Sequence, residues 1–150
     1  MSATQELTAQ QRFVEMVDKG ELADYDTIKP LFLELEGTTN EFMFGQWRGG
    51  NFRGETMVSN FYGKRFNTPE HCEPMLRTDD EGNVYAWGDW GEARLREVKY
   101  WDKVQSTVIY DDQPLMDYFR KVNDDLVIGL GDWKGKARGF FWLIRDRQAA

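Results

Sequence analysis

The stretch Gly45-Gln46-Trp47-Arg48-Gly49-Gly50 decides the fold, because it places a large ring between nearly bare backbone positions where an apolar segment begins. Successive side chains of a β-strand point to opposite faces, so Gly45, Trp47 and Gly49 share one face. Two glycines beside an indole leave it room to lie flat against packed neighbours. The stretch therefore indicates the floor of a small β-barrel, where we expect Trp47 to form a cation–π contact with Arg145 of the closing strand.

The chain beyond residue 41 consists of short apolar segments separated by turns such as Asp79-Asp80-Glu81-Gly82-Asn83. This texture favours an antiparallel meander, and about eight such strands can close into a barrel without exposed edges. Residues 114–120 also fit a helix that Asp112 caps, but the run Leu126-Val127-Ile128 after an Asp-rich turn favours a hairpin. The expected strands are residues 42–49, 52–62, 84–87, 93–101, 104–110, 114–122, 126–132 and 139–145.

The first part of the chain has a helical pattern. Its apolar residues fall near one stripe up to Val17, and Gly20 supplies a stop. A second short helix is expected before Pro30, with Asp26 and Thr27 as candidate caps. We therefore predict a mainly β single domain over residues 1–150, in which residues 1–40 form a helical cover and residues 41–147 form the barrel.

Composition excludes several classes of protein. With 150 residues, 41% of them hydrophobic, the chain suffices for one core, and its apolar runs are too short to cross a bilayer. The net charge of -7 argues against nonspecific nucleic-acid binding. The start of the chain lacks the features of a secretory signal, and the single cysteine, Cys72, allows no intramolecular disulfide, so a cytoplasmic location is expected.

Aromatic residues make up 15% of the chain, which indicates a ligand cavity or, alternatively, the interface of a homodimer. His71 is the only histidine, so a multi-histidine metal site is not available and no metal or other cofactor is expected. His71 and Cys72 are adjacent and would point to opposite faces of a strand, which disfavours a nucleophile and its base. Gly129-Leu130-Gly131 is too short for a dinucleotide fingerprint and is interpreted as a turn or bulge.

The opening stretch, together with Tyr62-Gly63-Lys64-Arg65-Phe66, resembles the Gly-x-Trp-x-Gly (GXWXG) family of small bacterial and fungal proteins. The ordered elements 93–98, 109–114, 117–122 and 129–132 are similar to the companion segment of unknown function that usually follows in that family. The resemblance implies an antiparallel calycin-like (lipocalin-like) barrel with a ligand cavity, and it implies no reaction. Gly131-Asp132 replaces a frequent Met-Asp pair, which would open space if residue 131 faces inward.

A small hydrophobic ligand with one polar end is the leading expectation for the cavity. The intracellular fatty-acid-binding barrels suggest, by analogy, that Arg96 and Tyr110 hold a ligand carboxylate. Lys64 and Phe66 are expected at the cavity rim. The expected ligand-binding residues are Lys64, Phe66, Arg96, Tyr110, Met116, Tyr118, Arg120, Phe140 and Trp142.

The alternative is a cofactor-independent isomerase, cyclase or hydrolase acting on a similar hydrophobic metabolite, with Asp111 or Asp117 as the candidate catalytic base. Alternation places Asp117 on the face of Leu115 and Phe119, and Met116, Tyr118 and Arg120 on the other face, so a polar group must lie beside a core. A structural interpretation competes with catalysis here, because Asp117 or Asp111 would also pair well with Arg94, Arg96 or Arg120.

Overall fold

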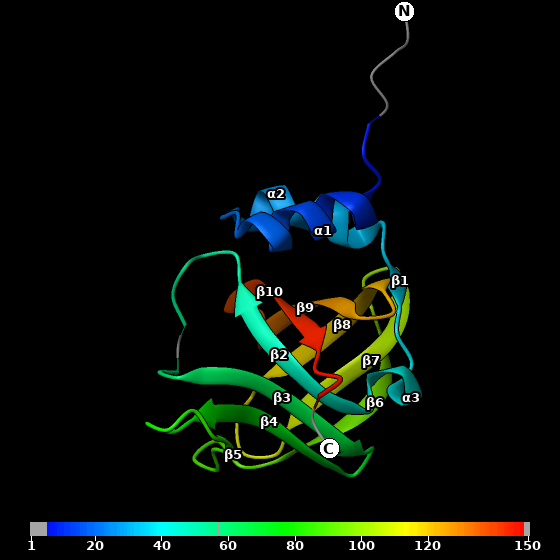
Figure 1. Cartoon of the computed structure of the whole chain (residues 1–150). Coiled ribbons are helices and arrows are strands. Elements are labelled where there is room, and N and C mark those ends of the chain that lie inside the picture. Colours follow the sequence, from blue (N-terminus) through cyan, green and yellow to red (C-terminus); the bar gives the residue numbers. More distant parts are fainter. Residues whose placement is uncertain (1–5, 57, 149–150) are drawn as a thin grey trace, which may run out of the picture.

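A computed structural model describes residues 6–56 and 58–148 of the chain (Figure 1). Within these residues it contains helices α1 (Ala9–Lys19), α2 (Tyr25–Leu33) and α3 (Asn40–Met43). The strands are β1 (Glu36–Gly37), β2 (Gly45–Asn51), β3 (Phe61–Thr68), β4 (His71–Thr78), β5 (Val84–Ala86), β6 (Ala93–Tyr100), β7 (Lys103–Tyr110), β8 (Met116–Asn123), β9 (Leu126–Trp133) and β10 (Ala137–Arg145).

The two long helices begin at side-chain caps. Thr8 and Gln11 form a reciprocal capping box at the start of α1, and Gly20 ends that helix in the left-handed conformation at φ 63°. Helix α2 begins after Asp24, whose side chain accepts a hydrogen bond from the backbone of Thr27. The expectation that Asp26 or Thr27 caps this helix before Pro30 was therefore wrong, because α2 begins earlier and continues through Pro30.

The sheet closes into an antiparallel barrel of eight strands, as predicted. The order around the barrel is β2-β3-β4-β6-β7-β8-β9-β10, and β10 pairs again with β2 from Phe141↔Asn51 to Arg145↔Trp47. The short β1 pairs with the far part of β8, and β5 pairs with β4. Segment 114–122, for which strand and helix were both considered, lies mainly in strand β8.

Two of the strand predictions failed, for local reasons. Residues 52–56 and 58–60 form a loop rather than a strand, because the side chain of Asn51 accepts hydrogen bonds from the backbone of Arg53 and Gly54 and turns the chain away; residue 57 of the predicted strand lies outside the described residues. Strand β4 was not predicted. It contains Pro74, and its ladder with β3 shifts register three times, so its burial shows no simple alternation.

Two apolar clusters stabilise the fold, one on each side of the barrel wall. Helices α1 and α2 lie over β8–β10 (Figure 1). The outer cluster packs these helices against outward side chains of the three strands, including Tyr118, Ile128 and Phe140. The inner cluster fills one end of the barrel with side chains such as Phe66, Phe119 and Val127. Both faces of β8–β10 are therefore apolar.

Trp47 lies in the inner cluster and is fully buried. Its indole donates to the carbonyl oxygen of Met43 at 2.9 Å, and the Arg145 guanidinium lies 4.3 Å from its ring centroid, which confirms the predicted cation–π contact. The explanation given for the glycines needs correction. A Cβ on Gly49 would meet Phe61 rather than the indole, and Gly45 adopts φ 120°, which favours glycine whatever the space.

The junction between β4 and β6 is short, with the one backbone pair Cys72↔Ala93 among the described residues. Other contacts supplement it. The backbone N–H of Leu95 donates to the Pro69 carbonyl at 2.8 Å, an exposed ion pair joins Arg96 to Glu70 at 2.7 Å, and the exposed His71 imidazole lies 3.0 Å from the Glu92 carboxylate. We call this junction, residues 69–72 and 92–96, the β4–β6 seam.

Candidate functional site

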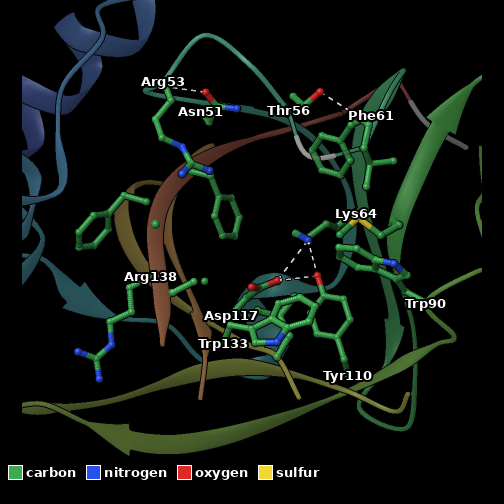
Figure 2. A pocket seen from close by; sticks show the side chains of 18 of the residues that line it. Asn51, Arg53, Thr56, Phe61, Lys64, Trp90, Tyr110, Asp117, Trp133 and Arg138 are labelled. Atoms are coloured by element: carbon green, nitrogen blue, oxygen red, sulfur yellow. Dashed lines mark hydrogen bonds and ion pairs between the residues drawn. The ribbon is translucent and has the colours of Figure 1, made fainter. Parts of the chain in front are cut away.

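A cavity of about 400 Å³ occupies the other end of the barrel interior (Figure 2). Its position follows from a row of missing side chains. Asp117 on β8, Gly131 on β9 and Gly139 on β10 lie directly beside one another in the ladders, and all three line the cavity. The cavity therefore lies where two of these three neighbouring positions carry no side chain. This arrangement confirms that residue 131 faces inward.

The next row of the same strands ends the cavity. Gly129 lies between Phe119 and Phe141 in the ladders, and a Cβ at Gly129 would come within 2.3 Å of the Phe141 ring. The ring of Phe141 thus lies over Gly129 and separates the open part of the barrel from the packed inner cluster. Gly129 and Gly131 lie in a regular ladder, so the interpretation of this segment as a turn or bulge was wrong.

Aromatic rings make up much of the wall. Trp90, from the loop between β5 and β6, contacts Trp133 edge-on at 5.7 Å between centroids and Tyr110 at 6.4 Å. Phe61 and Phe141 lie on the β3 and β10 sides. Such walls bind apolar surface and exclude water from polar groups beneath them.

Three polar side chains meet at the cavity floor, and Figure 2 shows them pointing toward one another: Lys64, Tyr110 and Asp117. The Lys64 ammonium donates to the Tyr110 hydroxyl at 2.9 Å and to the Pro74 carbonyl at 3.0 Å, and lies 3.2 Å from Asp117 Oδ2. The Tyr110 hydroxyl donates to the same Oδ2 at 2.9 Å. Each of the three residues is at least 96% buried. We call this group the floor cluster.

The floor cluster is built to hold a charge pair away from water. Burial, followed by the charge of Asp117 and the hydrogen bond to it, raises the pKa of Tyr110 well above its ordinary value. The hydroxyl therefore stays protonated and continues to donate to the carboxylate. The Lys64 ammonium also lies 5.3 Å from the Phe141 ring centroid and 5.6 Å from that of Phe61, so aromatic faces add to its stabilisation.

One oxygen of Asp117 remains available to the cavity. Every polar contact recorded for this carboxylate goes to Oδ2, and Oδ1 has no hydrogen-bond partner among the described residues. No side-chain oxygen or nitrogen in that part of the chain is both sealed from solvent and unpaired, so Oδ1 is accessible. It lies 3.3 Å from the position that a Cβ on Gly131 would take, which places it against the open space.

Two arginines lie near the cavity mouth, across from Trp90 in Figure 2. Arg138 pairs with Asp132 at 3.3 Å. Arg53 is exposed, and its guanidinium has no ion pair within residues 6–56 and 58–148. The mouth therefore carries positive charge in a chain of net charge -7.

The structure brings four of the predicted site residues to this cavity: Lys64, Tyr110, Asp117 and Phe140. Lys64 was expected at the rim but belongs to the buried floor cluster. Phe140 borders the cavity while its ring packs on Tyr25 and Phe32 of α2. The expected pairing of Asp117 with an arginine was wrong, because Lys64 provides the cation.

Most of the other predicted ligand-binding residues lie on the wrong face of their strands for this cavity. Met116 and Trp142 pack against the outer cluster, and Tyr118 stacks on Tyr100 at 4.2 Å between centroids. Phe66 faces inward but lies in the packed inner cluster, against Phe119. Their expected place in the cavity was therefore wrong, because the helices give the outer face an apolar surface of its own.

Two predicted arginines have structural surroundings instead. Arg120 is fully buried under α2, where it contacts the Phe32 ring at 4.7 Å and pairs with Asp102 at 3.0 Å. The Arg96 guanidinium contacts the Pro69 carbonyl and Glu70 at the β4–β6 seam and does not line the cavity with Tyr110, so the predicted Arg96–Tyr110 carboxylate site was wrong. Asp111 is half exposed and lies 3.8 Å from Arg94, as the structural interpretation expected, and it does not line the cavity.

Sequence reasoning missed several lining residues, notably Phe61, Trp90, Trp133 and Phe141. The glycines at 131 and 139 carried a usable signal, because side-chain gaps on neighbouring strands at matching register mark an opening in a barrel. For metals, no group of three or more His, Cys, Asp or Glu side chains placed to hold an ion occurs in the described part of the chain. Nor does any described helix have the length and apolarity to span a membrane.

A closed antiparallel barrel of eight strands with an aromatic-lined cavity defines a calycin-like barrel protein. The chain belongs to the GXWXG protein family, whose profile matches residues 30–82, and the companion "Domain of unknown function (DUF4334)" matches residues 91–145. Both matches confirm the predicted resemblance. The first covers β1–β4 and the second covers β6–β10.

A solved structure supports the same assignment. The chain is similar to a protein described as "Crystal structure of protein from Thermomonospora curvata", with 40% sequence identity and a TM-score of 0.88. The likeness covers 94% of this chain and 100% of that chain. The comparison with curated proteins gives no match.

Proposed function

We propose that this barrel binds a small, mainly apolar molecule that carries one polar group. The observation that supports the proposal is the combination of an aromatic-lined cavity of about 400 Å³ with a buried polar cluster at its floor. The wall would bury the apolar body of the ligand, and the floor cluster would orient its polar group. Binding and carriage require no further chemistry.

The direct test is native mass spectrometry of protein purified without denaturation, in which a copurified molecule would add a defined mass. A cavity-filling variant, Gly139→Leu, should lose that mass because it adds a side chain inside the cavity. The control is Lys136→Leu, which adds the same side chain at an exposed hairpin residue. Retention of the bound molecule by folded Gly139→Leu would contradict binding in this cavity.

A cofactor-independent enzyme is the second candidate, and the accessible Oδ1 of Asp117 favours it. A carboxylate open to an apolar cavity can accept a proton from a bound molecule, and the Tyr110 hydroxyl and Lys64 ammonium beside it can stabilise developing negative charge. Incubation with a metabolite extract, followed by mass spectrometry, would test this. Conversion by wild type but not by folded Asp117→Asn supports catalysis, and equal conversion by both contradicts it.

We also propose a cytoplasmic location, which the buried free thiol of Cys72 supports because free thiols persist in reducing compartments. Cell fractionation tests this proposal directly. Recovery of the protein outside the cytoplasmic fraction would contradict it.

A further inference from the structure

In the floor cluster the hydrogen-bond donors have partners within the protein, whereas one acceptor oxygen has none within residues 6–56 and 58–148. Lys64 has three N–H groups, and its ammonium has three close oxygen neighbours: the Pro74 carbonyl, the Tyr110 hydroxyl and Asp117 Oδ2. The proton of Tyr110 is directed at Oδ2. The donors of the cluster are thus committed within the protein, whereas the acceptor Oδ1 of Asp117 is accessible and unpartnered among the described residues.

From this we infer that the polar end of the ligand is a hydrogen-bond donor, a hydroxyl or an amine, and that it binds Oδ1 of Asp117. The inference rests on the proposed function and specifies the ligand class for the same site. It replaces the fatty-acid analogy, in which the protein supplies donors to a ligand carboxylate. Here the protein supplies the acceptor.

Electrostatics favours the same class. Lys64 and Asp117 neutralise one another, so a ligand carboxylate at the floor would bring an uncompensated negative charge into a site at least 96% buried. A hydroxyl loses much less hydration on entry, and its hydrogen bond to a carboxylate is charge-assisted and stronger than a neutral one. A carboxylate would be stabilised only near the mouth, beside Arg53.

The absence of a side chain at Gly131 leaves space for a ligand donor to reach Asp117 Oδ1. A Cβ at this position would lie 3.3 Å from Oδ1, so a side chain there would occupy the space that the ligand donor needs. Gly139, its ladder partner on β10, offers a matched comparison, because a Cβ there would be 3.7 Å from the Arg53 guanidinium. Neither glycine has a positive φ, so alanine is compatible with both backbones.

The experiment compares three probes at pH 7 by isothermal titration calorimetry: 2-naphthol, 2-methoxynaphthalene and 2-naphthoate. They share an apolar body and differ in offering a donor, a weak acceptor or a carboxylate. We expect wild type to bind 2-naphthol at least about tenfold more tightly than either other probe, which corresponds to about 1.4 kcal/mol. Gly131→Ala should reduce this preference to less than about threefold, and Gly139→Ala should keep it.

Each result decides a different point. Equal affinity for the three probes, or tightest binding of 2-naphthoate, would overturn the donor inference and leave the proposed function standing. A preference for 2-naphthol that persists in Gly131→Ala would overturn its assignment to Asp117. If no probe binds to wild type, the proposed function fails and this inference fails with it. The wild-type comparison is decisive even if Gly131→Ala does not fold.

Discussion

Replacing Lys64 by methionine removes the cation that contacts the buried carboxylate of Asp117. The side chains of this pair are 4% and 3% exposed, so water cannot readily take the place of the ammonium. Methionine keeps most of the apolar volume between Phe61 and Phe141, so the loss is mainly electrostatic. Removing one partner of a buried ion pair typically costs about 3–5 kcal/mol, and we expect a decrease of that size in the free energy of unfolding.

The magnitude can be divided by adding further substitutions. In Lys64→Met/Asp117→Leu no charge remains at the floor, so most of the loss should be recovered, and a deficit of about 1–3 kcal/mol should remain from the unpaired Tyr110 hydroxyl. Adding Tyr110→Phe should remove that deficit and bring the stability close to wild type or above it.

The assay is urea unfolding at pH 7, followed by tryptophan fluorescence and by circular dichroism, with linear extrapolation to water. Lys136→Met is the control, because Lys136 is exposed and its substitution should change stability by no more than about 0.5 kcal/mol. Stability of Lys64→Met within about 1 kcal/mol of wild type would refute the reasoning. Strictly additive effects of the Lys64 and Asp117 substitutions would refute it as well.

Three further outcomes are expected. Burial raises the pKa of the Cys72 thiol to about 12, so a thiol reagent at pH 8 should label native protein only as fast as it opens, and labelling within the mixing time would contradict this. Because the pKa of Tyr110 is raised on folding, its stabilising contribution is complete below about pH 10 and is lost as the pH rises further. Above pH 10 the unfolding free energy of Tyr110→Phe should therefore fall less steeply with pH than that of wild type. The two slopes should differ by up to about 1.4 kcal/mol per pH unit, and parallel curves from urea unfolding would count against this. Arg145→Lys should lower the free energy of unfolding measured in urea by about 1–2 kcal/mol. A lysine cannot reproduce the planar contact with Trp47 and the hydrogen bonds to the Phe42 and Phe44 carbonyls. An unchanged urea midpoint would argue against this role of Arg145.

The barrel could be predicted because its signals are local. Alternating segments, Asp- and Asn-rich turns and the Gly-flanked Trp47 each act over one hairpin or one strand. Strand β4 could not be predicted in the same way, because Pro74 and three register shifts remove the alternation on which such reasoning depends. The side chain of Asn51 likewise ends β2 through contacts that apolar patterning does not reveal.

The assignment of faces was half right. Alternation correctly separated Asp117 and Phe119 from Met116, Tyr118 and Arg120, but it could not decide which set faces the cavity. Both faces of β8 and β10 are buried, one by the barrel interior and the other by α1 and α2. Apolar content is therefore similar on the two faces, and several ligand-binding predictions were shifted by one residue along the strand.

The floor cluster was beyond local reasoning. Lys64 and Tyr110 are 46 residues apart in the chain, and their contact depends on how the three ladders between β3 and β7 are aligned. A lysine in a strand usually lies in solvent, and nothing near Lys64 in the sequence indicates its partner. The sequence did indicate the position of the cavity, through the missing side chains at Gly131 and Gly139.

The β4–β6 seam also lies between the two segments that the family profiles match, 30–82 and 91–145. One backbone pair, the hydrogen bond from Leu95 to the Pro69 carbonyl and the exposed ion pair Arg96–Glu70 hold these segments together there. Exposed ion pairs weaken as dissolved salt screens their charges. Amide protons along this junction should consequently exchange with deuterated solvent sooner than those of the β9–β10 hairpin, and the difference should widen with ionic strength. The barrel wall therefore has a preferred place to open, across the barrel from the β9–β10 ladder.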